Sequence, residues 1–190
     1  MTSPKPLLVP YRVEWEAESA ELISILRETL GDAAARIDHV GSTAIPLMTS
    51  KDVIDLQVSV LDLESATLIF DGPLSALGFE RSPFQVDHVP AGLDDDPVNW
   101  RKRLWTRRKA TATSVNLHVR KVGSPNERLA LLFRDWFRAH PAAVPAYGAV
   151  KESIAALAND RGTYADAKDP IVDLVIAVAE EWAWRVNWEV

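Results

Sequence analysis

Two stretches of sequence decide the fold, His39-Val40-Gly41-Ser42-Thr43 and Val53-Ile54-Asp55-Leu56-Gln57-Val58-Ser59-Val60. In the second stretch every other residue from Ile54 onward is aliphatic, and this period of two predicts a strand with one buried face. Asp55 and Gln57 belong to its other face. The first stretch ends a shorter predicted strand, residues 36–40, in a Gly-Ser turn. We therefore expect a strand, a Gly-Ser turn and an acidic strand at the centre of a sheet.

The flanking sequence adds helices before and after this sheet. Residues 15–30 carry apolar side chains at helical spacing, and Gly31 follows where a C-terminal cap belongs. The sequence Ser124-Pro125-Asn126-Glu127 is a capping box that predicts the start of another helix. Further helices are expected at residues 64–77, at 142–158 and, after an Asp169 cap, at 170–184; further strands are expected at 84–88, 104–108 and 114–120.

This order of elements predicts an α/β (α+β) fold with a mixed β-sheet and a C-terminal helical block. No linker or internal repeat divides the chain, so we expect one domain over residues 1–190. Helices on one face of the sheet are the expected packing.

Composition excludes several classes of protein. With no cysteine, neither a disulfide framework nor a thiolate zinc site is available. A net charge of −6 argues against extended nucleic-acid binding. The apolar stretch at residues 171–179 is far shorter than the ~20 residues of a membrane span, and the N-terminus has no signal-peptide pattern. No membrane association and a cytoplasmic location are therefore expected.

The Gly-Ser turn and the acidic strand have the chemistry of a phosphate site. Glycine lets a ligand approach the backbone N–H groups closely, and the hydroxyl of Ser42 can donate to the same phosphate oxygens. A carboxylate such as Asp55 can hold Mg²⁺ against a triphosphate. A simple turn and a solvated aspartate are the structural alternatives.

The same residues carry a family resemblance. Residues 37–46 and 51–58 resemble the signature of the GrpB-like family. The resemblance runs in order through roughly residues 10–180 and includes Leu117-His118-Val119, Gly123-Ser124-Pro125, Leu132-Phe133-Arg134-Asp135-Trp136, Ala139-His140-Pro141, Tyr147 with Lys151, and Tyr164 with Ala167-Lys168. This family is similar in fold to the DNA polymerase β-like nucleotidyltransferases.

The resemblance implies a nucleotide site with Mg²⁺ or Mn²⁺ as cofactor. In nucleotidyltransferases a Gly-Ser pair binds the terminal phosphates, which corresponds to Gly41 and Ser42, and an acidic pair on the next strand binds the metal. Here the pair is Asp55 and Gln57, so a neutral amide stands in the second position. A later strand often supplies a third ligand, and this chain offers His118 beside Asn116. Asp55 is thus the expected metal ligand, with Gln57 and His118 as weaker catalytic groups.

Several basic residues are candidates for phosphate contacts. Lys51 directly precedes the acidic strand. Six cations lie within nine residues: Arg101, Lys102, Arg103, Arg107, Arg108 and Lys109. This segment is either a hairpin with inward tryptophans or an anion-binding wall that includes Arg103. Lys151 falls on an apolar helical stripe and either snorkels or points into the cleft. Arg134 either does likewise or pairs with Asp135 or Asp173.

Other catalytic classes lack their sequence patterns. His39 and His118 show no zinc-protease spacing, and Ser42 lacks the Gly-x-Ser-x-Gly context of a serine hydrolase.

The first hypothesis is a metal-dependent nucleotidyl- or phosphoryltransferase that uses a nucleoside triphosphate and an unknown acceptor. Asp55 would hold metal, and Gly41, Ser42, Lys51, Arg103 and Lys151 would hold phosphate. The alternative is a catalytically inactive nucleotide- or anion-binding module with the same pocket, favoured by the neutral Gln57. A third hypothesis is an interaction module that uses Trp182, Trp184 and Trp188.

Overall fold

The computed structural model describes residues 5–108 and 113–190. Its elements follow in the order α1 (Glu14–Leu30), β1 (Arg36–Val40), β2 (Val53–Val60), α2 (Leu63–Ala76), β3 (Glu80–Arg81), β4 (Lys102–Arg107), β5 (Ser114–Lys121), α3 (Pro125–Ala139), α4 (Val144–Leu157) and α5 (Arg161–Val186). Short 3₁₀ helices occur at Gly31–Ala33, Ser42–Ala44, Pro97–Trp100 and Pro141–Ala143. Within the described ranges, no helix combines the length and the apolar character that a membrane crossing requires.

The strands form one mixed sheet in the order β1-β2-β5-β4-β3. The central pair, β2 and β5, is parallel, and the other pairs are antiparallel. Its register sets Asp55 opposite Asn116 and Gln57 opposite His118. The β1–β2 pairing ends with Val40 opposite Asp55, so the Gly41–Ser42 turn begins beside that carboxylate. The predicted strands at 36–40 and 53–60 are confirmed.

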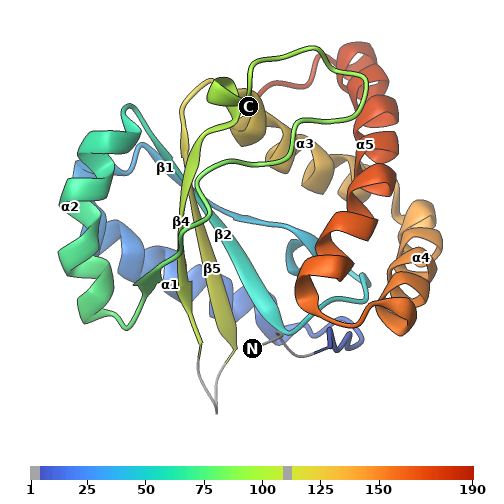
Figure 1. The fold of residues 1–190 in the computed structure, drawn as a ribbon, viewed down its shortest axis with the longest axis horizontal. Coiled ribbons are helices and arrows are strands. Elements are labelled where there is room, and N and C mark those ends of the chain that lie inside the picture. The colour runs from blue at the N-terminus through green and yellow to red at the C-terminus, as the bar shows by residue number, and fades with distance from the viewer. Residues whose placement is uncertain (1–4, 109–112) are drawn as a thin grey trace.

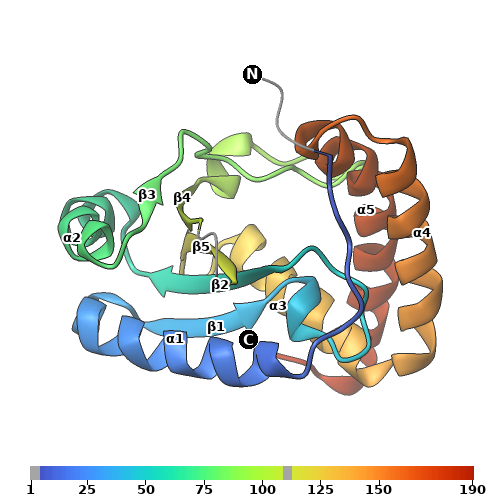
Figure 2. The same cartoon turned by 90° about the horizontal axis from the view of Figure 1, so that it is seen from below.

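Helices α1 and α2 cover the aliphatic face of the sheet, as Figures 1 and 2 show. Trp15 from α1, Leu56 from β2, Phe70 from α2, Trp105 from β4 and Leu117 from β5 belong to one buried cluster. Burial of apolar surface in this cluster is the main stabilising contribution to the fold. The cluster fixes which side chains of β2 face the helices and which face away.

The three C-terminal helices lie beside the opposite, polar face of the sheet (Figure 1). They pack on one another and on the segment after β1, in a separate cluster that contains Met48, Phe137 and Tyr147. The expectation that the helices share one face is therefore wrong. Because α1 and α2 already fill the aliphatic face, the C-terminal helices bury their apolar sides among themselves.

Helix α5 begins nine residues before the predicted start. Asp160 caps it by accepting hydrogen bonds from the N–H groups of Gly162 and Thr163 at 2.8 and 2.9 Å. Pro170 lies inside the helix, so Asp169 is a helical residue and not the cap. A proline near an acidic residue is typical of a helix start, but here the carboxylate of Asp160 supplies the earlier and stronger cap.

The chain between β3 and β4 is mostly irregular. The predicted strand at 84–88 is wrong, because Val86 makes only an isolated bridge to Arg101, and the short strand β3 was not predicted. This segment reaches across to α5, which Figure 2 shows at the end of the molecule opposite α2. There Asp173 accepts hydrogen bonds from the N–H of Ala91 at 2.9 Å and from the ring of His88 at 3.0 Å. The segment therefore spans the open side of the polar face.

The start of α3 differs from the predicted capping box. The carboxylate of Glu127 accepts the N–H of Gly123 at 2.7 Å, and the hydroxyl of Ser124 donates to the carbonyl of Lys121 at 2.7 Å. Ser124 is the N-cap residue but makes no side-chain cap hydrogen bond. The helix still begins at Pro125, where the fixed φ of proline favours the first turn.

Candidate functional site

A pocket of about 360 Å³ lies between the polar face of the sheet and the C-terminal helices. This volume is in the range of small-molecule sites, roughly 300–1,000 Å³. The sheet contributes Asp55, Asn116 and His118, and the turn after β1 contributes Gly41 and Ser42. The helices contribute Leu129, Phe133, Tyr147, Lys151, Tyr164, Lys168 and Ile176. One end of the pocket is thus polar and charged, and the wall from α3 is largely apolar, while α5 adds Asp169 and Asp173 beside its apolar residues.

The Gly41–Ser42 turn approaches the carboxylate of Asp55 directly. Gly41 has a backbone φ of +70°, which residues other than glycine rarely adopt. A Cβ atom at Gly41 would lie 2.7 Å from Asp55 Oδ2, closer than van der Waals contact permits. Glycine is therefore required here both for the backbone conformation and for the space that Asp55 occupies.

Asp55 is held as an anion by its neighbours on β5. Asn116 Nδ2 donates to Asp55 Oδ1 at 2.7 Å, and His118 Nε2 lies 3.5 Å from the same oxygen. Burial raises the pKa of Asp55. The hydrogen bonds from His118 and Asn116 and the charge of Lys51 lower this pKa by a larger amount, so the net pKa is well below the usual range. Burial lowers the pKa of His118 below its ordinary value. At neutral pH an ionised Asp55 therefore faces a neutral imidazole.

Three lysines from different parts of the chain converge on the same end of the pocket. Lys151 of α4 is buried, and its Nζ donates to Ser42 Oγ at 2.8 Å and to the carbonyl of Thr49 at 2.5 Å. Burial, with the charges of Lys168 and Lys51, lowers the pKa of Lys151 to about 7. Burial and then Lys51 also lower the pKa of Lys168.

Lys51 completes this group. Its Nζ lies 5.3 Å from the ring centroid of Tyr164, a cation–π distance. Because these three ammonium groups, hereafter the lysine cluster (Lys51, Lys151 and Lys168), repel one another in the free protein, an anion bound among them would be stabilised by all three. The cluster has the electrostatic character of a phosphate site.

Gln57 lies on the face predicted for it but does not line the pocket. Its side chain is fully buried, with Oε1 accepting from Arg120 at 2.6 Å and Nε2 donating to the carbonyl of Glu127 at 3.2 Å. The expectation that Gln57 joins Asp55 in one cleft is therefore wrong. The neighbouring side chain of Arg120 and the start of α3 enclose it.

The donor set around Asp55 does not fit a preformed divalent-metal site. Asp55 Oδ1 already accepts from Asn116, and its neighbours His118 and the lysine cluster are neutral or positive. Among the described residues, no group of three or more His, Cys, Asp or Glu side chains is arranged to hold a metal ion. Mg²⁺ requires several oxygen ligands and depends on negative charge. The residues present supply one carboxylate and several competing cations.

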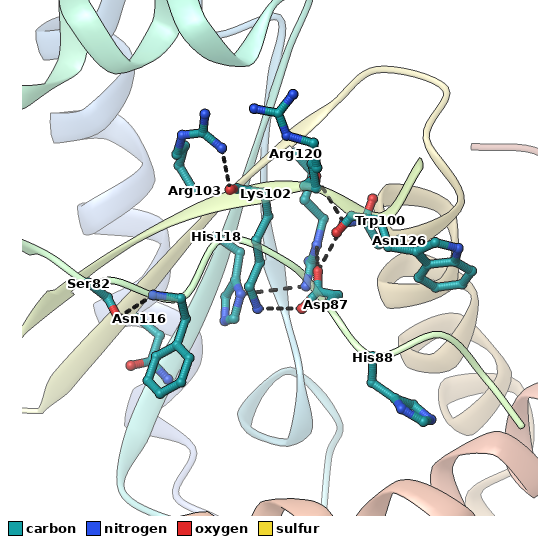
Figure 3. Close-up of polar contacts among 12 residues, drawn as sticks. Ser82, Asp87, His88, Trp100, Lys102, Arg103, Asn116, His118, Arg120 and Asn126 are labelled. Carbon is teal, nitrogen blue, oxygen red and sulfur yellow. Dashed lines mark hydrogen bonds and ion pairs between the residues drawn. The ribbon is translucent and has the colours of Figure 1, made fainter. Parts of the chain in front are cut away.

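Two of the predicted phosphate contacts are misplaced. Arg103 pairs with Val119 on β5, so it lies on the aliphatic face, where it binds Glu64 of α2 at 2.7 Å. Figure 3 shows it pointing away from His118 and Asp87. Arg134 binds Asp135 at 2.7 Å and the carbonyl of His39 at 3.1 Å and does not line the pocket. Both expectations are wrong, because local pairing partners take up these guanidinium groups. Lys109 lies outside the described residues.

The pocket also contains residues that the sequence did not single out as functional. Lys168 and Tyr164 are one helical turn apart on α5, in a segment that was predicted to precede the helix. Their spacing of four would have identified a shared face had the Asp160 cap been recognised. Asp87 and His88 come from the irregular segment after β3. No pattern in that segment predicts its path.

Asp87 is the centre of a buried polar network next to the pocket (Figure 3). It accepts from Lys102 Nζ, from Arg120 Nε at 2.9 Å and from Asn126 Nδ2 at 3.0 Å. Burial raises the pKa of Asp87. The charges of Arg120 and Lys102 lower this pKa by a larger amount, so that it lies well below the usual range. The network joins the segment after β3 to β4, β5 and α3.

Known proteins resemble this chain in sequence or in structure. The chain is 34% identical over 200 residues to a protein described as dephospho-CoA kinase from Mycolicibacterium paratuberculosis, with 96% of this chain and 48% of that protein covered. The chain therefore spans about half the length of that relative. The crystal structure of the conserved protein GrpB from Enterococcus faecalis matches with a TM-score of 0.75 and 23% identity, over 94% of this chain and 99% of that chain.

A more distant likeness concerns the fold alone. The structure of a cytoplasmic RNA terminal U-transferase matches with a TM-score of 0.50 and 19% identity, over 75% of this chain and 40% of that chain. The nucleotidyltransferase-like fold expected from the sequence is thus confirmed. The family model described as GrpB protein matches residues 5–177. The chain belongs to the GrpB family.

Proposed function

We propose that this protein binds a nucleoside triphosphate in the pocket, with the phosphate groups held by Gly41, Ser42 and the lysine cluster. The observation that carries the proposal is the convergence of three lysines from separate elements at one end of the pocket, where burial and mutual repulsion lower the pKa values of Lys151 and Lys168. Such an arrangement costs free energy in the free protein. A polyphosphate would offset that cost by adding negative charge next to the three ammonium groups.

The contact between Lys151 and Ser42 adds a directional element. The ammonium form of Lys151 donates from Nζ to Ser42 Oγ, which accepts the hydrogen bond. The hydroxyl hydrogen of Ser42 is then available to a phosphate oxygen, next to the backbone of Gly41. Lys151 would thereby orient Ser42 as well as provide charge.

The apolar wall of the pocket suits the rest of a nucleotide. The rings of Phe133 and Tyr147 pack edge to face, with their centroids 5.6 Å apart. Leu129 and Ile176 also line the pocket. Aromatic and aliphatic side chains stabilise a base by stacking and by burial of its surface.

Nucleotidyl or phosphoryl transfer is the second candidate function, and the pairing of Asp55 with His118 favours it. The ionised Asp55 could accept the proton of an acceptor hydroxyl while the hydroxyl oxygen attacks a phosphorus atom and the bond to the leaving phosphate breaks. His118, with Nε2 at 3.5 Å from Asp55 Oδ1, would orient that carboxylate. A metal-dependent form of this reaction would require the nucleotide to bring most of the metal ligands itself. Among the described residues, Asp55 and the other carboxylates of the pocket lining (Asp87, Asp169 and Asp173) form no group that could hold a metal ion.

The test of binding is calorimetry with ATP, UTP, pyrophosphate and uncharged nucleosides. We expect the phosphate-bearing compounds to bind, with affinity that falls as salt rises, and nucleosides to bind at least tenfold more weakly. Ser42→Ala should weaken binding, and Lys121→Gln, which removes an exposed lysine outside the pocket, should leave it unchanged. Failure of all phosphate compounds to bind, or binding that Ser42→Ala and Lys151→Met do not affect, would contradict the proposal.

The transfer hypothesis needs its own assay. Wild-type protein and His118→Gln would be incubated with labelled ATP or UTP and with RNA or small hydroxyl acceptors. Transfer by wild type and its loss in His118→Gln, with nucleotide affinity retained, would support catalysis. Tight nucleotide binding without transfer to any acceptor would leave the protein as a binding module.

A further inference from the structure

Asp55 and Gln57 occupy neighbouring positions on the polar face of β2, where the resemblance to nucleotidyltransferases leads one to expect two acidic metal ligands. In this chain the second position carries an amide, and a guanidinium group lies against it. Arg120 donates to Gln57 Oε1 at 2.6 Å, and both side chains are at least nine-tenths buried. The second metal-ligand position therefore carries an amide whose oxygen is already bound by a fixed cation of the protein.

Contacts continue from this guanidinium toward Asp55. Arg120 lies 3.5 Å from His118 Nδ1, and His118 Nε2 lies 3.5 Å from Asp55 Oδ1. On its other side Arg120 binds Asp87 at 2.9 Å, and Figure 3 shows Lys102 and Arg120 meeting at this carboxylate. An arginine stays charged at every accessible pH, so a permanent cation lies beside Gln57 and is separated from Asp55 by His118.

Charge balance at this end of the pocket argues in the same direction. Asp55 approaches the Gly41–Ser42 turn, and the lysine cluster supplies cations around it. A divalent ion at Asp55 would share the carboxylate with Asn116 and lie among like charges. The same cations are well placed to neutralise phosphate oxygens without any metal.

We propose that Arg120, by binding Gln57, prevents this position from serving as a metal ligand, so that the protein binds its phosphate ligand with the lysine cluster and without a metal. The inference rests on the proposed phosphate binding and adds that Mg²⁺ competes with the protein for the phosphates. Arg120 acts through Gln57 and His118 and is a positioning residue.

The first experiment measures ATP and pyrophosphate binding by calorimetry, in EDTA and in excess Mg²⁺. We expect binding in EDTA that is at least as tight as in Mg²⁺, and several-fold tighter for ATP, because free ATP carries more negative charge than its Mg²⁺ complex. Binding that occurs only with Mg²⁺ overturns this inference and leaves the proposed function standing. Absence of binding under both conditions overturns the proposed function, and the metal question is then decided by the second experiment.

The second experiment uses Mn²⁺ alone, followed by electron paramagnetic resonance. Wild type and Gln57→Glu should both bind no Mn²⁺, because Arg120 pairs with the new carboxylate. The double variant Gln57→Glu/Arg120→Met should gain Mn²⁺ binding, and adding Asp55→Asn should abolish it. Circular dichroism checks that each variant is folded. If the double variant does not fold, the measurement of Mn²⁺ binding to the wild-type protein still tests the proposal. Mn²⁺ binding to wild type that Asp55→Asn removes, a gain in Gln57→Glu alone, or no gain in a folded double variant would each overturn the proposal.

Discussion

Asp55 Oδ2 lies 2.7 Å from the position that a Cβ atom of Gly41 would occupy. The turn after β1 and the acidic strand β2 are therefore fitted to one another at atomic contact, and the backbone of one passes directly over the carboxylate of the other. A ligand held by the turn would be held next to Asp55.

This contact predicts the effect of Gly41→Ala. The methyl group would displace the Asp55 carboxylate and strain the backbone, which at φ +70° and ψ −168° is nearly restricted to glycine. We expect a loss of stability of roughly 2–4 kcal/mol and a loss of phosphate binding. Chemical unfolding and calorimetry would measure both.

Gly31→Ala is the matched control. Gly31 has similar angles, φ +55° and ψ −147°, but no atom lies within 4 Å of the position that a Cβ would take there. It should cost roughly 1–3 kcal/mol from backbone strain alone and leave phosphate binding intact. Equal effects of the two substitutions on binding would show that the Gly41–Asp55 contact is unimportant.

Lys168 is predicted to contribute to phosphate binding, although the sequence marked it only as part of the family resemblance and not as a phosphate ligand. Lys168→Gln removes one cation of the lysine cluster and should weaken pyrophosphate binding by roughly tenfold or more, the value of one charge-assisted hydrogen bond. Calorimetry at low salt would detect this change. Lys121→Gln alters the net charge equally from an exposed site and should change affinity by less than about twofold. A similar loss in both variants would indicate only a long-range charge effect.

Lys151→Met is expected to stabilise the free protein while it removes phosphate binding. The pKa of Lys151 falls from 10.5 to about 7 on folding, and each unit corresponds to about 1.4 kcal/mol. This cost exceeds the roughly 1–3 kcal/mol lost when the Thr49 carbonyl loses its donor. The cost of the buried charge is full below pH 7 and disappears as the pH rises toward 10.5, because only the unfolded chain then keeps the proton.

Urea unfolding of both proteins at several pH values would test this prediction. The gain from Lys151→Met should be largest below pH 7 and should shrink or change sign above pH 9. A variant that is less stable than wild type at pH 6 would contradict it. Lys121→Met, at an exposed position, should show no such pH dependence.

Asp87→Asn should strongly destabilise the protein. It would leave Lys102 and Arg120, both buried, without their shared carboxylate. Removing one partner of a buried ion pair costs roughly 3–5 kcal/mol. Because the pKa of Asp87 is lowered by folding, its stabilising effect is complete above about pH 4, the usual carboxyl pKa, and is lost as the pH falls below it.

Unfolding in guanidinium chloride at pH values between 3 and 7 would measure how the free energy of unfolding changes as Asp87 loses its stabilising effect. The difference between wild type and Asp87→Asn should be constant near neutral pH and should narrow in acid. Asp166→Asn, which changes an exposed aspartate on α5, should stay within about 0.5 kcal/mol of wild type at every pH. A small, pH-independent effect of Asp87→Asn would mean that the network does not stabilise the fold.

The sequence by itself determined the elements whose signals are local. The alternation along residues 53–60 correctly separated the buried side chains from Asp55 and Gln57, because successive side chains of a strand must point to opposite faces. The glycine of the Gly-Ser turn and the helical stripe that buries Lys151 were also visible in the sequence. Turn residues and helical spacing depend only on neighbouring residues in the chain.

Contacts between distant parts of the chain decided the rest. The period of β4 put Arg103 on one face but could not say which face meets the pocket, since that depends on the register of Arg103 opposite Val119. Gln57 is withdrawn from the pocket by Arg120, 63 residues away. Lys168 reaches the pocket because Asp160 starts α5 early and the helix continues through Pro170. Periodicity is a local property of the chain, whereas register and charge pairing arise only when remote segments meet.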